Sequence, residues 1–515
     1  MAAVLSPDVD VAVIGAGAMG AGIAQVAAVA GHRVRLYDTR AGAAATAIVG
    51  IRSALDKLAG KGRMTPEAAA AAAGRVSSVD GLAELAGCGL AIEAIVERLD
   101  AKRSLFKELE QALAADAILA TNTSSISVTA IGTGLRHPGR LAGLHFFNPA
   151  PQMPLVEVIG GMATAATIGA RLMATMSSWG KIPVRARNTP GFIVNRVARP
   201  YYAEGLRLLS EGAADCATID ALMRESGGFR MGPFELMDLI GHDVNYAVTR
   251  SVFDACYGDP RFTPSLQQLE LVEAGFLGRK SGRGFYDYRE GATKATAMTL
   301  ARCAPPRRIR LYSGTLADAL AGRLASNGIA FERLGFHADG RCAEADTAAL
   351  YRTDGRTATA RSAASGIHNT VLVDLALDDA RAERLGLAIA DQSDSAALAA
   401  AAGLLQAAGY AVSCLDDLPG MAVMRTVAML ANEAADAVHY GVCSAADADL
   451  AMCKGVNYPR GPLAWADELG IETVLTVLDH LARSYGEDRY RASPLLRRKQ
   501  QAAGRFHQIR ETVHG

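Results

Sequence analysis

Residues 10–20 read DVAVIGAGAMG, a short apolar run followed at once by a Gly-x-Gly-x-x-Gly turn. The apolar run has the length of a strand, residues 21–30 have a helical pattern, and residues 33–37 (RVRLY) form a second strand candidate. This strand–turn–helix–strand order predicts a Rossmann-type unit, in which the glycine turn meets the pyrophosphate of a dinucleotide.

Three glycines and one acid give this turn its predicted chemistry. Gly15 permits the tight turn, Gly17 lets a pyrophosphate approach the backbone, and Gly20 lets helix and strand pack closely. Asp38 follows the last glycine by 18 residues, where a carboxylate hydrogen-bonds an adenosine ribose and repels a 2′-phosphate. We therefore predict NAD as the cofactor, in preference to NADP.

A second stretch, LAGLHFFNPAPQMPLVEVI at residues 141–159, holds one histidine and one carboxylate. Two apolar runs flank a Pro-rich turn at residues 148–154, so two short strands can bring His145 beside Glu157. A carboxylate fixes the tautomer of a neighbouring imidazole and stabilises the imidazolium, which is how a general base is built. Taken alone, such a pair is more often a buried structural histidine with an unrelated glutamate.

The composition argues against several classes of function. Lys and Arg total 53 and Asp and Glu also total 53, so charge gives no reason to expect nucleic acid or a membrane surface as a partner. No apolar run approaches the roughly 20 residues of a membrane span, and residues 1–9 lack a signal-peptide pattern. The eight cysteines show no metal-ligand spacing, so we expect reduced thiols in a cytoplasmic protein and no metal site.

Strand and helix patterns alternate through the first part of the chain, which predicts a parallel, doubly wound sheet. Glu97, Ser124 and the turn after His145 all follow predicted strands, so they can face one crevice at the carboxyl ends of the strands. From Phe192 onward helical patterns take over at residues 195–211, 216–226 and 232–252, and a Gly- and Lys-rich loop at residues 278–286 ends this block.

The order of eight motifs closely resembles the L-3-hydroxyacyl-CoA dehydrogenases over residues 10 to about 288. The motifs are GAGAMG, AIEAIVE, NTSS, LHFFNP, LVEVI, NTPGFIVNR, MGPFELMDLIG and GRKSGRGFYDY. This resemblance implies NAD-dependent, reversible oxidation of an L-3-hydroxyacyl-CoA to the 3-oxoacyl-CoA. It also implies an α/β Rossmann-like domain followed by an all-α dehydrogenase domain.

The resemblance assigns roles to matching positions. It implies His145 as general base, Glu157 as its orienting partner, and Ser124 and Asn195 as polar contacts to the substrate. NAD contacts are implied for Asp38, Glu97, Lys102, Asn148 and Lys280. Ser53 and a nearby lysine, Lys57 or Lys61, fall in the helix that meets the CoA phosphates, although a solvated helix face is the ordinary reading of such a pattern.

The second half repeats the helical block. An offset of 229 residues takes Gly191 to Gly420, Glu204 to Glu433 and Gly241 to Gly470, which indicates a duplicated module. Asn195 becomes Met424, so function is not copied. Between the copies a strand–helix–strand pattern survives, but its glycine positions are Ser313, Thr315 and Asp318 and should not bind NAD. We predict four parts: 1–187 (NAD-binding domain), 188–290 (first helical domain), 291–405 (linker and truncated Rossmann remnant) and 406–515 (non-catalytic helical repeat).

Two further expectations concern assembly and substrate. The two helical domains should pack as an internal pseudo-dimer, which allows a further homodimer of the whole chain. The double length resembles the phenylacetate-degradation branch of the family, whose substrate is 3-hydroxyadipyl-CoA, and Arg230 could bind the terminal carboxylate of that acyl chain. The alternatives are a short-chain 3-hydroxybutyryl-CoA dehydrogenase, a hydroxyacid dehydrogenase with a lysine base, and a non-catalytic NAD-binding protein.

Overall fold

The computed structural model describes residues 3–507, and the chain forms two compact units. Of the described residues, 3–196 and 440–456 form unit 1, and 197–439 and 457–507 form unit 2. Within the described residues no helix is both long and apolar enough to span a membrane. The described part also contains no cluster of three or more His, Cys, Asp or Glu side chains placed to hold a metal ion.

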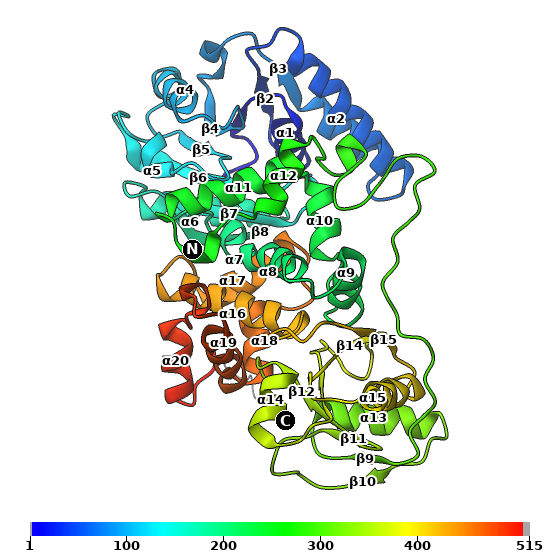
Figure 1. Ribbon diagram of the computed structural model, residues 1–515. Helices are drawn as coiled ribbons and strands as arrows, with labels where there is room; N and C mark the ends of the chain where they lie inside the picture. The colour runs from blue at the N-terminus through cyan, green and yellow to red at the C-terminus, as the bar shows by residue number, and fades with distance from the viewer. Residues whose placement is uncertain (1–2, 508–515) are drawn as a thin grey trace, which may run out of the picture. The chain divides into compact units, whose positions relative to one another are not determined.

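Unit 1 is built on an eight-stranded sheet with the order β3-β2-β1-β4-β5-β6-β7-β8 (Figure 1). Neighbouring strands are parallel except for the antiparallel pair β6 and β7. This arrangement confirms the predicted Rossmann-like sheet. The strands are β1 Asp10–Ile14, β2 Val34–Tyr37, β3 Val76–Ser78, β4 Cys88–Glu93, β5 Ile118–Thr121, β6 Leu141–Phe146, β7 Leu155–Gly160 and β8 Ile182–Arg187.

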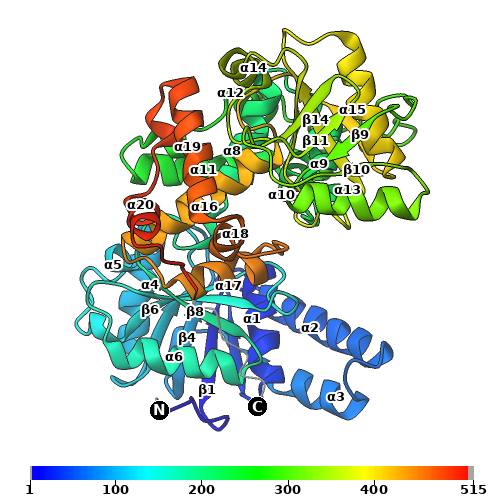
Figure 2. The ribbon, with the colours of Figure 1, turned by 90° about the horizontal axis from the view of Figure 1, so that it is seen from below.

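The helices of unit 1 cover this sheet. α1 begins directly after the glycine turn and buries eight of its residues, as expected for the crossover helix of a Rossmann unit. α2 and α3 lie side by side and contact α1 and β3 (Figure 2). The helices are α1 Ala18–Val29, α2 Ala43–Gly60, α3 Pro66–Gly74, α4 Leu99–Ala112, α5 Val128–Ile131, α6 Ala166–Ser178 and, across the unit boundary, α7 Val194–Val197.

One segment of unit 1 comes from the far end of the chain. The backbone N–H of Arg187, at the end of the edge strand β8, donates to the carbonyl of Val442 at 2.8 Å. The helix that follows, α17 (Ala445–Gly455), packs on β7 and β8. Part of the second half therefore belongs to the compact unit that holds the predicted catalytic residues.

Unit 2 begins with the first helical copy. A single helix was predicted over residues 232–252, and this prediction is wrong at its centre. Gly241 has a φ of +97°, which ends α10 and starts α11. The helices are α8 Arg199–Ser210, α9 Cys216–Glu225, α10 Pro233–Ile240, α11 His242–Ala255 and α12 Leu266–Glu273.

A second, seven-stranded sheet follows in unit 2, after an extended segment that is visible in green in Figure 1. Its order is β10-β9-β11-β12-β13-β14-β15, with parallel and antiparallel neighbours mixed. The elements are β9 Ile309–Leu311, α13 Thr315–Ser326, β10 Glu332–Arg333, β11 Ala343–Ala345, β12 Ala348–Arg352, α14 Ala358–Ser365, β13 Thr370–Val373, β14 Arg384–Ile389, α15 Ser395–Ala407 and β15 Ala411–Cys414.

The turn between β9 and α13 stands where the first sheet has its glycine turn. Asp318 lies in the first turn of α13 and forms an ion pair with Arg333 of β10. A carboxylate at the start of this helix occupies the place where a dinucleotide phosphate would be bound. The strand–helix–strand remnant of the second half is confirmed.

The second helical copy repeats the backbone of the first. Left-handed residues recur at the predicted offset of 229: Gly191 and Gly420 have φ of +74° and +77°, and Phe192 and Met421 have +47° and +54°. Positive φ is uncommon for Phe and Met, so the shared strain supports duplication. The helices of this copy are α16 Val423–His439, α17, α18 Pro462–Leu469, α19 Ile471–Tyr485 and α20 Pro494–Gln501.

Buried ion pairs join the two copies within unit 2. Glu204 on α8 accepts from Arg425 Nε of α16 at 2.7 Å and from Arg489 Nη2 at 2.9 Å. In the opposite sense, Arg261 of the first copy contacts Glu433 at 3.2 Å. Glu204 and Glu433 are equivalent positions, so each copy offers the same carboxylate to an arginine of the other.

Candidate active site

His145 and Glu157 face each other across the antiparallel strands β6 and β7. Their backbones are directly paired in the sheet, and His145 Nδ1 lies 2.6 Å from Glu157 Oε2. Both side chains are buried. A carboxylate only accepts, so the neutral form of the His145 ring carries its proton on Nδ1 and its lone pair on Nε2. The sequence-based prediction that the Pro-rich turn brings these two residues together is confirmed.

The other oxygen of Glu157 holds the start of α7. Glu157 Oε1 accepts from the backbone N–H groups of Ile193 and Val194 at 2.9 and 3.0 Å. One side chain thus fixes both the imidazole and the segment that carries Asn195. We call this arrangement, in which one oxygen of Glu157 contacts His145 and the other binds the start of α7, the Glu157 clamp. The sequence carried no local sign of this second contact.

The second half keeps a counterpart of this clamp. Asp374 accepts from the backbone N–H groups of Ala422, Val423 and Met424 at 2.8–3.1 Å. These three stand 229 residues after Ile193, Val194 and Asn195. Burial raises the pKa of Asp374, against the effect of these N–H donors. The backbone role of the acid is therefore retained in the copy that has lost Asn195.

A chain of hydrogen bonds leads from the start of α7 to the glutamate after β4. Asn195 Nδ2 donates to the carbonyl of Ser124 at 3.4 Å, and Ser124 N donates to Glu97 Oε1 at 3.0 Å. The Nζ of buried Lys102 lies 3.1 Å from Glu97 Oε2 and 2.6 Å from Glu93 Oε1. The fold therefore brings together six of the predicted site residues: His145, Glu157, Asn195, Ser124, Glu97 and Lys102.

The charge of Glu97 is stabilised by its neighbours. Burial opposes ionisation, but the Lys102 ammonium and the Thr123 hydroxyl outweigh it and lower the pKa of Glu97. Thr123 Oγ1 donates to Glu97 Oε1 at 2.5 Å. Glu97 is thus a fixed carboxylate at the carboxyl end of the sheet. Glu93 and Thr123, which the sequence analysis did not single out, complete its setting.

The glycine turn has the shape that a dinucleotide requires. A Cβ on Gly15 would lie 2.4 Å from the carbonyl oxygen of Ala94, and one on Gly20 would lie 1.7 Å from that of Gly15. A Cβ on Gly17 would meet no described atom within 4 Å, so this face of the backbone is open. A pocket of about 670 Å³ begins here, lined by Gly15, Gly17, Asp38 and Val96 among others.

Asp38 closes the second strand and is held by two groups. Its carboxylate accepts from the N–H of Ala16 at 2.8 Å and from Arg40 Nε at 3.1 Å. Hydrogen bonding from Arg40 lowers the pKa of Asp38 to about 2, so the acid is ionised at neutral pH. Arg40 was missed in the sequence, although an arginine two residues after the acid bears on the choice between NAD and NADP.

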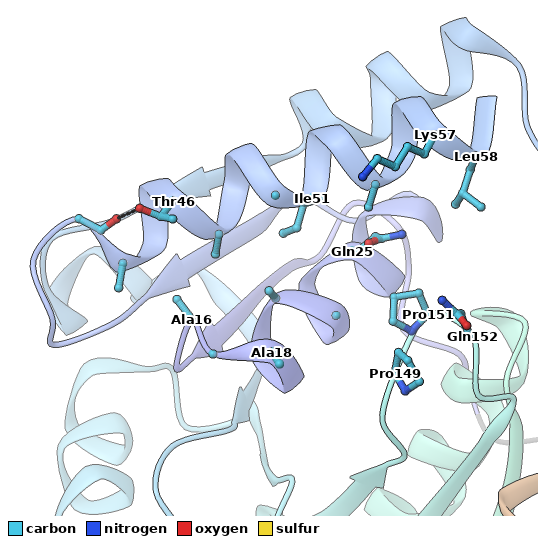
Figure 3. Close-up of a pocket in the computed structure, with 18 of the residues that line it drawn as sticks. Ala16, Ala18, Gln25, Thr46, Ile51, Lys57, Leu58, Pro149, Pro151 and Gln152 are labelled. Atoms are coloured by element: carbon cyan, nitrogen blue, oxygen red, sulfur yellow. Dashed lines mark hydrogen bonds between the residues drawn. The ribbon is translucent and has the colours of Figure 1, made fainter. Parts of the chain in front are cut away.

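A larger groove of about 1440 Å³ lies between α1, α2 and the loop after β6 (Figure 3). Lys57, Lys61, Arg40 and Arg63 contribute positive charge to its lining. Figure 3 shows Lys57 on α2, on the side that faces Gln25 and Pro151. Ser53 is exposed on α2 but does not line the groove. Arg63 was not identified from the sequence.

The far wall of the groove is the loop at residues 148–154. Lys181 Nζ donates to the carbonyls of Ala150 and Met153 at 2.5 and 2.9 Å, which ties the loop to the start of β8. Burial lowers the pKa of Lys181 to about 8. Asn148, one of the predicted cofactor contacts, is exposed in this loop.

Two predicted site residues belong to unit 2. Lys280 lies in the loop that follows α12, and its Nζ is 2.5 Å from Oδ1 of Asp243 on α11. Arg230 is exposed and precedes α10. Both roles stay predictions.

Three family models match the chain. Residues 10–189 match "3-hydroxyacyl-CoA dehydrogenase, NAD binding domain", and residues 191–288 and 420–509 match "3-hydroxyacyl-CoA dehydrogenase, C-terminal domain". Residues 350–419 match "3-hydroxybutyryl-CoA dehydrogenase reduced Rossmann-fold domain". The helical model matches twice, in agreement with the duplication.

Individual proteins are similar over most or half of the chain. The 3-hydroxyadipyl-CoA dehydrogenase of Escherichia coli (strain K12) is 45% identical over 490 residues, which cover 95% of this chain and 97% of that protein. A probable 3-hydroxybutyryl-CoA dehydrogenase of Deinococcus radiodurans is 41% identical over 54% of this chain and 99% of its own. A crystal structure of 3-hydroxybutyryl-CoA dehydrogenase from Escherichia coli K12 superposes with a TM-score of 0.88 and 44% identity, covering 97% of this chain and 99% of that one.

Proposed function

Because the chain belongs to the 3-hydroxyacyl-CoA dehydrogenase family and is an NAD-dependent oxidoreductase, we propose that it oxidises 3-hydroxyadipyl-CoA to 3-oxoadipyl-CoA. The chemistry rests on one observation, the buried His145–Glu157 pair with Nδ1 and Oε2 2.6 Å apart. The acyl chain rests on the full-length similarity to a 3-hydroxyadipyl-CoA dehydrogenase.

In this proposal His145 is the general base. With Nδ1–H donated to Glu157, Nε2 takes the proton from the substrate hydroxyl, and Glu157 stabilises the imidazolium that results. Ser124 and Asn195 bind the reacting oxygen or its neighbours. The hydrogen bond from Asn195 Nδ2 to the Ser124 carbonyl holds these two residues in place relative to His145.

The glycine turn and its acids fit NAD. Gly17 leaves the backbone open to the pyrophosphate, Asp38 is an ionised acceptor for the adenosine ribose, and the fixed pair Glu97–Lys102 stands at the carboxyl end of the sheet. Asn148 and Lys280 are further proposed contacts. When bound, NAD supplies the hydride acceptor for C3 of the substrate.

We assign the positive groove to the CoA part of the substrate. Lys57 and Lys61 line it and would bind phosphates as point charges, and Arg63 and Arg40 add two further cations. Ser53 contributes only at the margin, because it lies on α2 outside the lining. The same proposal divides the chain at residues 187 and 290. The third division, expected at residue 405, is placed after β15 instead, because β15 pairs with β14 in the second sheet. The ion-paired helical copies are treated as an internal pseudo-dimer.

A second substrate deserves a direct comparison, because the solved Escherichia coli structure with a TM-score of 0.88 is titled 3-hydroxybutyryl-CoA dehydrogenase. Steady-state kinetics with both CoA esters tests the choice. We expect kcat/KM to be higher for 3-hydroxyadipyl-CoA than for 3-hydroxybutyryl-CoA. A higher value for 3-hydroxybutyryl-CoA would establish the short-chain alternative.

Cofactor preference gives the first prediction. NAD should be used at least about tenfold more efficiently than NADP, since the ionised Asp38 would repel a 2′-phosphate. Asp38→Asn should narrow the gap, because Arg40 is then released toward the phosphate. The measurement is kcat/KM for each cofactor at saturating substrate. Equal efficiency in the wild-type protein would contradict the prediction.

The second prediction concerns the choice of acyl chain. If the Arg230 guanidinium binds the terminal carboxylate, Arg230→Met should lower kcat/KM for 3-hydroxyadipyl-CoA by about 1.5–3 kcal/mol. Turnover of 3-hydroxybutyryl-CoA, which has no terminal carboxylate, should hardly change. Arg279→Met, in the loop after α12, is a control for loss of a unit 2 arginine. Equal losses on both substrates would limit Arg230 to a role in folding.

A further inference from the structure

The degenerate second half reaches the proposed catalytic strand through the C-terminal end of α17. A Cβ on Gly455, the last residue of this helix, would lie 2.5 Å from Leu155 Cδ2 and 3.2 Å from Val194 Cγ2. The helix is therefore in close contact with both segments at once. Any larger side chain at this position must displace one of them.

Those two contacts are the two sides of the Glu157 clamp. Leu155 begins β7, two residues before Glu157, and the N–H of Val194 donates to Glu157 Oε1 at 3.0 Å. The other oxygen of Glu157 holds His145. The atoms near Gly455 belong to the side chains of Leu155 and Val194, so a displacement that extends from either side chain to its backbone would reach the imidazole through one buried carboxylate.

Other contacts of the same segment point to the same strands. Val442 accepts from the N–H of Arg187 at the end of β8, and the ring of Tyr440 lies 5.6 Å from the guanidinium carbon of Arg196. Burial, then the charges of Asp447 and Glu157, raise the pKa of Cys443 to about 12. The segment at residues 440–456 therefore contacts β8 and Arg196 near its start, and Leu155 and Val194 at its end.

The first helical copy makes the crosswise contact in unit 2. α9, which is equivalent to α17, packs on β14 of the second sheet. The hydroxyl of Ser226, the residue equivalent to Gly455, donates to the carbonyl of Arg384 at 2.6 Å, and the backbone carbonyl of Ser226 accepts from Leu377 N at 2.8 Å. Each helical copy thus supports the Rossmann-type sheet of the other half.

We infer that α17 is a positioning element for the catalytic pair, and that Gly455 is the residue through which it sets the place of Glu157. This inference rests on the proposed roles of His145 and Glu157. It gives the non-catalytic half a specific task in the reaction: to hold β7 and the start of α7 at the spacing at which Glu157 meets both His145 and the Ile193–Val194 backbone.

Gly455→Val tests it in the full-length protein. We expect kcat to fall about tenfold or more, as small misplacements of catalytic groups commonly do, while the Kd for NADH is unchanged. Lys454→Val is the matched control, since it introduces the same side chain at the exposed neighbour on α17. Adding Leu155→Ala to Gly455→Val removes the clashing leucine and should restore part of the lost kcat.

Activity is expressed per NADH-binding site, so loss of folded protein does not imitate loss of kcat. Should Gly455→Val fail to fold, Gly455→Ala takes its place, because its Cβ alone meets Leu155. Wild-type kcat per site in the variant, or a parallel loss of NADH affinity, would overturn the inference. A failure of the proposed function gives different results from a failure of this inference. In that case the wild-type protein would not turn over the substrate, or His145→Gln would keep full turnover.

Discussion

His145→Gln should bind NADH with normal affinity and lose turnover by roughly 10²–10⁴-fold, the usual contribution of a positioned base. Glutamine at position 145 can still donate to Glu157 Oε2, so the clamp on Ile193 and Val194 is preserved. What it lacks is the second ring nitrogen that takes the substrate proton. NADH titration and steady-state kinetics on the same preparation separate the two properties.

Glu157→Gln is the companion variant and should lose less, because the imidazole remains. Its amide oxygen can still accept from Ile193 N, but its NH₂ group would face His145 Nδ1 and favour the wrong tautomer. Retention of more than a tenth of wild-type turnover by His145→Gln would refute the assignment of the base.

Removal of the Glu204 carboxylate should destabilise the fold by about 3–5 kcal/mol, the range measured when one partner of a buried ion pair is lost. Glu204→Ala would leave Arg425 and Arg489 buried without their shared acceptor. Glu487→Ala is the control: Glu487 also pairs with an arginine of the other copy, Arg207, but its side chain is 46% exposed. That variant should lose less than about 1 kcal/mol.

The Glu204 contribution should depend on pH in a defined direction. Burial alone would raise the pKa of Glu204, but the guanidinium groups of Arg489 and Arg425 outweigh it and lower the pKa to about 2 from an ordinary value of 4.5. The stabilisation is therefore complete above about pH 4.5 and is lost as the pH falls toward about 2. Urea unfolding at several pH values checks this, and a constant difference between wild type and Glu204→Ala down to pH 3 would contradict it.

The fold of the first half of the chain can be predicted from the sequence because its sequence motifs are local. The apolar run before Gly15 and the turn between His145 and Glu157 each specify a structure within about twenty residues. The second sheet was harder, since strands such as Ala343–Ala345 and Ala348–Arg352 are short and alanine-rich, a composition that favours helices. The split at Gly241 was missed because glycine is tolerated within an apparent helical pattern.

Contacts between distant segments were not predictable in the same way. Arg425 and Glu204 are 221 residues apart, and Asp374 and Val423 are 49 apart, so no spacing rule connects them. The offset of 229 located equivalent positions but not their partners. Arg63 could not be assigned from the sequence, because the groove that it lines exists only after α1, α2 and the loop after β6 come together.

The ion pairs between the helical copies have a consequence for behaviour on dilution. Subunits of an ordinary dimer separate when the protein concentration falls below the dissociation constant. Here Glu204 and Arg425 belong to one polypeptide, so the copies meet at a fixed effective concentration set by the connecting chain. Assembly of the helical pair is therefore a first-order event, and its population does not change with the amount of protein in the cell or the cuvette.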